Sequence, residues 1–96
     1  MSIIELAILR ATAGHGDAFA DALTSTLSSV AGAADGCLGA SALRSVERPE
    51  ELALSVEWVS VAAHEDFQKT DTFAGLRPAF QEHLDEVVSI AHYSKL

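Results

Sequence analysis

Three side chains in the second half of the chain could act together in a pocket: Trp58, His64 and Arg77. Trp58 offers a broad apolar face and an indole N–H donor. His64 could be a general base because imidazole titrates near neutrality, although Glu65 and Asp66 beside it favour its charged form. Arg77 lies in an apolar stretch, where a guanidinium could hold an anion. Such a set would suit proton removal and stabilisation of the resulting anion.

Each of these residues also has a purely structural interpretation. Trp58 could close the core at the end of a strand, which is compatible with lining a pocket. His64 could be an exposed histidine on the first turn of a helix. Arg77 could form a surface ion pair with Asp71 or Glu82, which would contribute little to stability. Both interpretations stay open for all three residues.

Further candidates for a substrate wall lie close by in the sequence. Three phenylalanines at helical spacing are core residues first and substrate contacts second: Phe67, Phe73 and Phe80. His83, three residues after Phe80, could edge a pocket or lie in solvent. His92 is interpreted as a structural or dimer-interface histidine. The lone Cys37 cannot form an internal disulfide and is interpreted as a small buried hydrophobe.

Elements that would position these residues follow from apolar periodicity and turn residues. The expected elements are a strand over 3–11, a helix opening at Asp17 and stopping at Gly36, strands over 37–47 and 52–59 joined by a turn at 48–51, a helix capped by Ser60, a helical run recapped at 70–72 that breaks at Pro78, and a strand over 87–93. This order is β-α-β-β-α-β, which is typical of a ferredoxin-like α+β fold with a four-stranded antiparallel sheet.

The strand alternation also indicates what each sheet face contacts. Leu52, Leu54, Val56 and Trp58 share one side of the third predicted strand, which we expect to face the helices. The first predicted strand is apolar on both sides, as strands covered on both faces are. Because no further element is available, a second copy of the sheet is the simplest cover. This predicts a homodimer packed through its sheets.

Length and charge restrict the class of protein. Ninety-six residues with 49% apolar composition make one globular domain over 1–96. A net charge of −8 with scattered basic residues argues against nucleic-acid and anionic-membrane partners. No apolar run spans a bilayer, and the N-terminus lacks the features of a signal peptide. The expected location is cytoplasmic.

The chain resembles the antibiotic biosynthesis monooxygenase (ABM) domain, a dimeric α+β barrel, over nearly its whole length. The resemblance is carried by the element order and by scattered positions: Gly36-Cys37, Pro49, Trp58-x-Ser60-x-x-Ala63, Phe67, Thr70, Phe73 and Ala91-His92-Tyr93. It implies a pocket between the sheet and the helices of each subunit. It further implies oxidation of phenolic or quinol-like aromatics with O₂, without metal, flavin or other cofactor.

Positions that depart from the family pattern keep other functions open. Oxidising members carry an asparagine where this chain has Leu54, and some carry a tyrosine where it has His64. Haem-degrading relatives need an asparagine on the first strand and a histidine in the second helical segment, and neither is found here. Two alternatives to a monooxygenase are a non-oxidative small-molecule enzyme or binding protein, and a non-catalytic dimer. The last would have its pocket filled by phenylalanines, with His64 and Arg77 in water.

Overall fold

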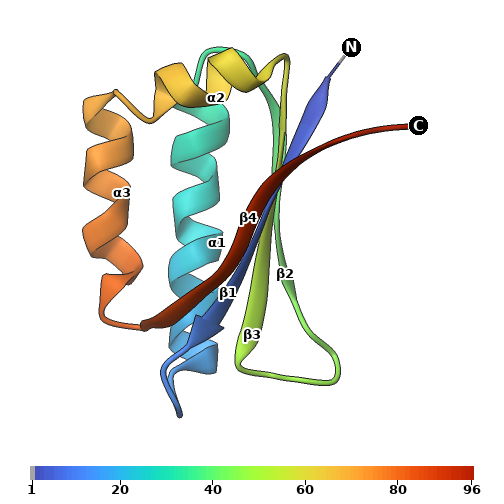
Figure 1. Ribbon diagram of the computed structural model, residues 1–96. Helices are drawn as coiled ribbons and strands as arrows, with labels where there is room; N and C mark the ends of the chain where they lie inside the picture. Colours follow the sequence, from blue (N-terminus) through green and yellow to red (C-terminus); the bar gives the residue numbers. More distant parts are fainter. Residues whose placement is uncertain (1) are drawn as a thin grey trace.

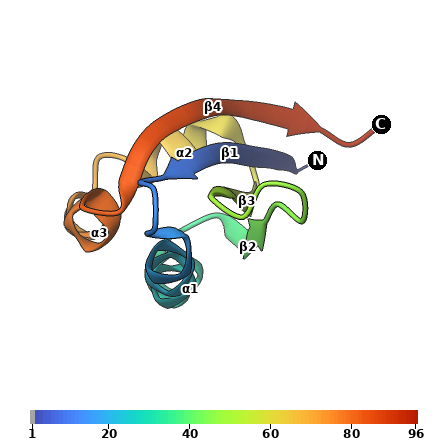
Figure 2. The same ribbon diagram turned by 90° about the horizontal axis from the view of Figure 1, so that it is seen from below.

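A four-stranded antiparallel sheet with its helices on one side forms the framework of the molecule (Figures 1 and 2). The computed structural model describes residues 2–96, apart from the side chains of residues 32 and 33. The elements are β1 (Ile3–Ala11), α1 (Gly16–Ala33), β2 (Cys37–Arg44), β3 (Glu51–Trp58), α2 (Val61–Phe67), α3 (Asp71–Gln81) and β4 (Leu84–Ser94). The strand order β2-β3-β1-β4 confirms the expected ferredoxin-like α+β fold. No helix within residues 2–96 is long and apolar enough to cross a membrane.

The register of β1, in the middle of the sheet, decides which side chains face the helices. Glu5 lies opposite Val56 of β3 and His92 of β4, and two residues further on Ala7 lies opposite Leu54 and Ile90. Because successive residues of a strand point to opposite faces, all of these share one face. Trp58, two residues beyond Val56, lies on the same face and is almost fully buried.

Two apolar clusters hold the helices against this face. The first joins α1 to the middle of the sheet: Ala7, Leu9, Ala11, Phe19, Leu23 and Leu52. The second lies where β3 leads into α2: Val30, Ala34, Val56, Trp58 and Phe67. Leu54 packs against both clusters. In contrast, α3 contains no buried residue. It therefore stands partly away from the sheet and leaves space beneath it.

Helix starts in this region follow local side-chain chemistry. The Ser60 hydroxyl accepts a hydrogen bond from the Ala63 backbone N–H, and the Thr70 hydroxyl accepts one from Phe73. Both expected caps are thus confirmed. Gly36 ends the passage from α1 to β2 with a φ of 82°, and a Cβ there would lie 2.8 Å from the Ala63 side chain. Glycine is required at this position for both reasons.

Some expected boundaries were wrong. The helix does not break at Pro78, because α3 continues through it to Gln81. Pro78 lies on an exposed face near the helix end, where water can bond the carbonyl that the proline leaves unpaired. β2 ends at Arg44 rather than at residue 47. A register shift between Cys37 and Gly39 also turns Leu38 outward, so it is 57% exposed.

The face of the sheet opposite the helices is apolar and uncovered within residues 2–96. The side chains of Ile4, Leu6 and Ile8 alternate with the helix-facing residues of β1 and are half-buried. Leu43 on β2 and Tyr93 on β4 are each more than half exposed. The described chain therefore provides no cover for this face, as the alternation of β1 predicts.

Candidate functional site

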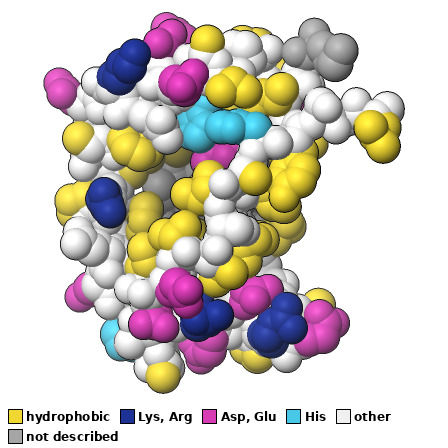
Figure 3. Space-filling model, viewed as in Figure 1, with side chains coloured by type: hydrophobic (Ala, Val, Ile, Leu, Met, Phe, Trp, Pro, Cys, Tyr) yellow, Lys and Arg dark blue, Asp and Glu magenta, His cyan; other side chains and the backbone are white. Residues whose placement is uncertain are grey.

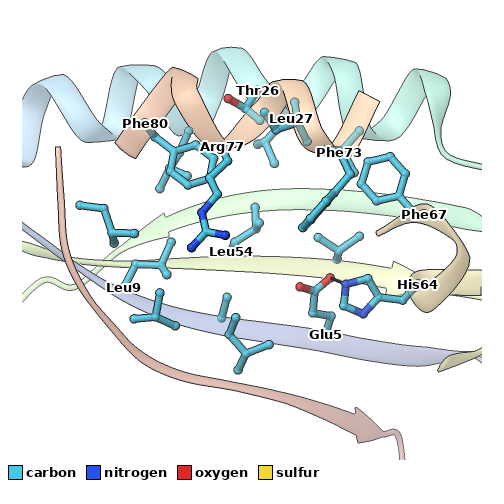
Figure 4. A pocket seen from close by; sticks show the side chains of 18 of the residues that line it. Glu5, Leu9, Thr26, Leu27, Leu54, His64, Phe67, Phe73, Arg77 and Phe80 are labelled. Atoms are coloured by element: carbon cyan, nitrogen blue, oxygen red, sulfur yellow. Dashed lines mark ion pairs between the residues drawn. The ribbon is translucent and has the colours of Figure 1, made fainter. Parts of the chain in front are cut away.

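A cavity of about 280 Å³ lies between the sheet and helices α1 and α3. Its walls are mainly the apolar side chains of the two clusters and of the cavity side of α3, and Figure 4 shows these pointing inward. The space-filling view shows a hollow on this side of the molecule, with hydrophobic side chains around it and histidines above it (Figure 3). The location agrees with the expected pocket between sheet and helices.

A cluster of three polar groups forms one end of the cavity. The Trp58 indole Nε1–H donates to Glu5 Oε1 at 3.0 Å, and His64 Nε2 lies 3.2 Å from the same oxygen. The indole and imidazole rings stack, with centroids 5.1 Å apart and planes inclined by 19°. Both Glu5 and His64 are buried. A buried carboxylate is costly unless polar groups surround it; Trp58 donates a hydrogen bond, and His64 Nε2 lies in polar contact with the same oxygen.

The second nitrogen of His64 is also engaged. Its Nδ1 lies 2.7 Å from Nε2 of His92, an exposed residue of β4. Burial lowers the pKa of His64 below its usual value of 6.5, and this exceeds the opposing effect of the Glu5 carboxylate. His64 is therefore neutral at pH 7. His64 Nδ1 and His92 Nε2 share one hydrogen bond, and the tautomers of the two rings determine which nitrogen donates.

A guanidinium faces the cavity from the opposite wall. Arg77 lines the cavity from α3, and Figure 4 shows its side chain extending from the helix toward the sheet. Within residues 2–96 it forms no ion pair, so the expected partners Asp71 and Glu82 do not hold it. The cavity thus has a carboxylate–imidazole cluster at one end and an exposed positive side chain over its apolar floor.

Comparison with known proteins places this site in a family. The family model described as antibiotic biosynthesis monooxygenase matches residues 2–86. The chain belongs to this family. Among curated proteins, no significant match to the chain is found.

Solved structures of ABM-type proteins share the fold closely. A candidate antibiotic biosynthesis monooxygenase from Bordetella bronchiseptica is 27% identical with a TM-score of 0.90, covering 99% of this chain and 97% of that chain. A Pseudomonas aeruginosa protein is 22% identical with a TM-score of 0.82, covering 99% and 94%. A second candidate antibiotic biosynthesis monooxygenase, from Caulobacter crescentus, is 18% identical with a TM-score of 0.85, covering 99% of this chain and 90% of that chain.

Most side chains singled out in this ABM chain line the same cavity. The structure brings together Leu54, Trp58, His64, Phe67, Phe73, Arg77 and Phe80. His64 is buried rather than exposed on the helix surface, because it packs under Trp58. The prediction for His83 was wrong. His83 lies outside the cavity, where its Nδ1 is 3.0 Å from Nδ1 of His15 at the start of α1.

Sequence reasoning missed two members of the cluster, Glu5 and His92. Glu5 carried a usable signal, since it is the one charged residue among the helix-facing positions Ile3, Glu5, Ala7 and Leu9. An acidic residue at a core position of an apolar strand is rarely buried unless it is paired. His92 carried no such signal. Its place beside His64 depends on the pairing of β1 with β4, which brings residues 28 positions apart into contact.

Proposed function

We propose that this ABM-family chain is a cofactor-independent monooxygenase that oxidises a phenolic or quinol-like aromatic with O₂. The observation that carries the proposal is an apolar cavity with a buried carboxylate–imidazole–indole cluster at one end and Arg77 on the facing wall. Apolar walls suit a flat ring, a proton acceptor suits its hydroxyl, and a guanidinium suits the anion that remains.

The reaction explains why these groups suffice. Ground-state O₂ reacts slowly with closed-shell molecules, but an electron-rich phenolate can give it one electron. The protein must therefore bind the phenol, remove its proton and stabilise the negative charge as it forms. Arg77 can supply the last of these, because its guanidinium carries a fixed positive charge on the wall of the cavity.

The cavity dimensions favour a compact substrate. Its volume of about 280 Å³ lies at the lower end of the range of about 300–1,000 Å³ found for small-molecule sites. Aromatic side chains of Phe67, Phe73 and Phe80 line it, and they can pack against the faces or edges of a substrate ring. These features support a fused aromatic of a few rings rather than a long flexible chain.

The alternatives make different demands on the same cavity. A non-oxidative enzyme or a binding protein would use the same walls without any dependence on O₂. A non-catalytic dimer would have the cavity filled by phenylalanines and His64 in water. The open volume and the burial of His64 count against this last alternative.

A second copy of the chain completes the proposal. We expect two copies to pack through the outer sheet faces, because Ile4, Leu6 and Ile8 form an apolar face that no described element covers. This arrangement would leave each cavity on the helix side of its own subunit. The cytoplasmic location stays a prediction from the sequence.

The test is O₂ consumption with a panel of hydroquinones and anthrones, measured with an oxygen electrode. We expect Arg77→Ala to lower turnover by about 100-fold or more, the range seen when one group that stabilises a developing oxyanion is removed. Arg77→Lys should retain part of the activity. Arg48→Ala is the matched control, because Arg48 pairs with Glu51 in the hairpin turn, away from the cavity.

Two results would contradict the oxidative proposal. If the wild type binds a phenol, as judged by a thermal shift, but consumes no O₂, the binding or non-oxidative alternative is favoured. If Arg77→Ala and Arg48→Ala behave alike, Arg77 does not hold the anion.

A further inference from the structure

We infer that Glu5, and not His64, accepts the substrate proton, with His64 and His92 as positioning residues that hold the Glu5 carboxylate. This inference rests on the proposed oxidation of a phenolic substrate. It assigns the catalytic base to β1, in the centre of the sheet, rather than to α2.

Both ring nitrogens of His64 face other side chains of the protein, which argues against His64 as the group that meets the substrate. Its Nε2 lies 3.2 Å from Glu5 Oε1 and its Nδ1 lies 2.7 Å from His92 Nε2. The Trp58 ring stacks on one face of the imidazole. A general base needs a free lone pair within hydrogen-bond reach of the proton it takes. With both nitrogens engaged, His64 offers none to the cavity.

Glu5 does have a free acceptor. Its Oε1 accepts a hydrogen bond from Trp58 and lies 3.2 Å from His64 Nε2, whereas within residues 2–96 no hydrogen bond reaches its Oε2. Among buried side-chain atoms of residues 2–96, only Glu50 Oε2 lacks a hydrogen-bond partner. The unpaired Glu5 Oε2 is therefore accessible rather than sealed in the core. Figure 4 shows one Glu5 oxygen directed at His64 and the other toward the open cavity.

The surrounding rings fix the direction of that free oxygen. Trp58 is 1% exposed and cannot move without opening the second apolar cluster. Its N–H donates to Glu5 Oε1 and His64 Nε2 lies 3.2 Å from the same oxygen, so rotation of the carboxylate would break the hydrogen bond to Trp58 and lose the contact with His64. His92 in turn holds the His64 ring from β4, with the two rings edge to face. The carboxylate is thus held in place before substrate binds, which is what rate enhancement by positioning requires.

The reaction balances with O₂ as the only co-reactant. Glu5 Oε2 takes the proton of the substrate hydroxyl, leaving a phenolate near Arg77. The phenolate gives one electron to O₂, and the two radicals combine to form a C–O bond at a ring carbon para to the hydroxyl. The Glu5 proton passes to the outer peroxide oxygen. The ring carbon that carries the peroxide then loses its hydrogen as a proton while the O–O bond breaks. The outer oxygen leaves as hydroxide and combines with that proton to form water, and the ring carbon becomes the second carbonyl of a quinone.

The first experiment compares Glu5→Gln with wild type by O₂ uptake. Glutamine keeps the size and a carbonyl acceptor for Trp58 but cannot take a proton. We expect turnover to fall by at least about 100-fold, the contribution of a general base. Glu5→Asp keeps the carboxylate but moves it away from the cavity by one methylene, so its turnover should lie between those of wild type and Glu5→Gln. Glu47→Gln is the matched control, since Glu47 is exposed in the loop between β2 and β3 and does not line the cavity.

The positioning role of His64 has its own readout. His64→Leu should lower kcat with little change in KM, because the carboxylate loses its orientation while the cavity walls stay. His64→Gln, whose amide can donate to Glu5, should recover part of that kcat. A fall in kcat that is equal in both variants would overturn the positioning role.

An anaerobic titration separates this inference from the proposed function. A bound nitrophenol whose hydroxyl lies against the Glu5 carboxylate should form its coloured anion at a pH about one unit or more higher in wild type than in Glu5→Gln, because a neighbouring negative charge disfavours the anion. If the wild type consumes no O₂ but shows this shift, the proposed oxidation is refuted, whereas the proposed contact between Glu5 and the bound hydroxyl is supported. If O₂ uptake survives Glu5→Gln, or the titrations coincide, Glu5 is not the proton acceptor.

Discussion

Replacing Trp58 with phenylalanine tests whether the indole N–H stabilises the buried carboxylate. Trp58 is almost fully buried, donates to Glu5 and stacks on His64. Phenylalanine keeps an aromatic ring in the same cluster but removes the donor. The substitution therefore separates the hydrogen bond from most of the packing.

Two contributions set the expected loss of folding free energy. A hydrogen bond to a charged group is worth about 1.5–3 kcal/mol. The smaller ring also gives up the equivalent of about two buried carbon groups, or roughly 1.6 kcal/mol at about 0.8 kcal/mol each. Together they give about 3–4.5 kcal/mol, which is a large part of the roughly 5–15 kcal/mol that stabilises most domains.

The assay is urea unfolding followed by far-ultraviolet circular dichroism at one fixed protomer concentration. Fluorescence cannot serve, because Trp58 is the only tryptophan. The matched control is Phe67→Leu, which alters a ring 5.6 Å from that of Trp58. We expect it to cost less, because no hydrogen bond to the Glu5 carboxylate is lost.

A double-mutant cycle with Glu5→Gln isolates the hydrogen bond itself. A bond between neutral groups is worth about 0.5–1.5 kcal/mol, so Trp58→Phe should cost about 1–1.5 kcal/mol less in the Gln background. A loss below about 1.5 kcal/mol in the wild-type background, with no coupling, would refute the reasoning. It would mean that water in the cavity satisfies the carboxylate as well as the indole does.

For three further perturbations, the structure determines the direction of the expected change in stability or oligomeric state. Burial lowers the pKa of His64 below 6.5, so on acidification the unfolded chain takes up a proton before the folded chain does. The free energy of unfolding, measured by urea unfolding across pH, should therefore fall as the pH decreases below about 6.5. Above this pH the titration of His64 should have no effect on it. In His64→Gln the part of the pH dependence that is due to His64 should disappear. Leu6→Lys on the outer sheet face should convert a dimer to monomers in analytical ultracentrifugation, whereas Thr24→Lys on the exposed side of α1 should not. Pro78→Ala restores a helix N–H and should raise the free energy of unfolding by up to about 3 kcal/mol. Gly75→Ala in the same helix is the comparison and should raise it by about 1 kcal/mol. No gain for Pro78→Ala would mean that α3 is held in its position by something other than its own hydrogen bonds.

Local sequence chemistry predicted much of the framework. Ser60 and Thr70 each cap a helix because a hydroxyl placed before an apolar run can bond the backbone N–H three residues on. The period of two along β3 placed Trp58 on the helix-facing side with Leu54. These inferences succeed because the interacting groups are a few residues apart, so the sequence itself contains their geometry.

Tertiary context decided the features that the sequence did not predict. Pro78 stays helical because its helix is exposed and near its end, which lowers the cost of a missing hydrogen bond. The Glu5, His64 and His92 contacts join three elements, and only the sheet register brings them together. The neighbours of His64 in sequence, Glu65 and Asp66, suggested a charged imidazole. Burial beneath Trp58 reverses that expectation.

The half-satisfied carboxylate of Glu5 fits the proposed binding site better than a purely structural polar core. A buried acidic residue kept only for structure would have hydrogen-bond donors around both oxygens. Glu5 accepts from Trp58 at Oε1, whereas within residues 2–96 its Oε2 has no donor and opens onto a cavity whose other walls are almost entirely apolar. Valine or leucine at this position would fill space and avoid the cost. The arrangement gains an advantage only when a ligand brings a hydroxyl to the free oxygen, and Arg77 on the facing wall is suited to the charge that the ligand would then develop.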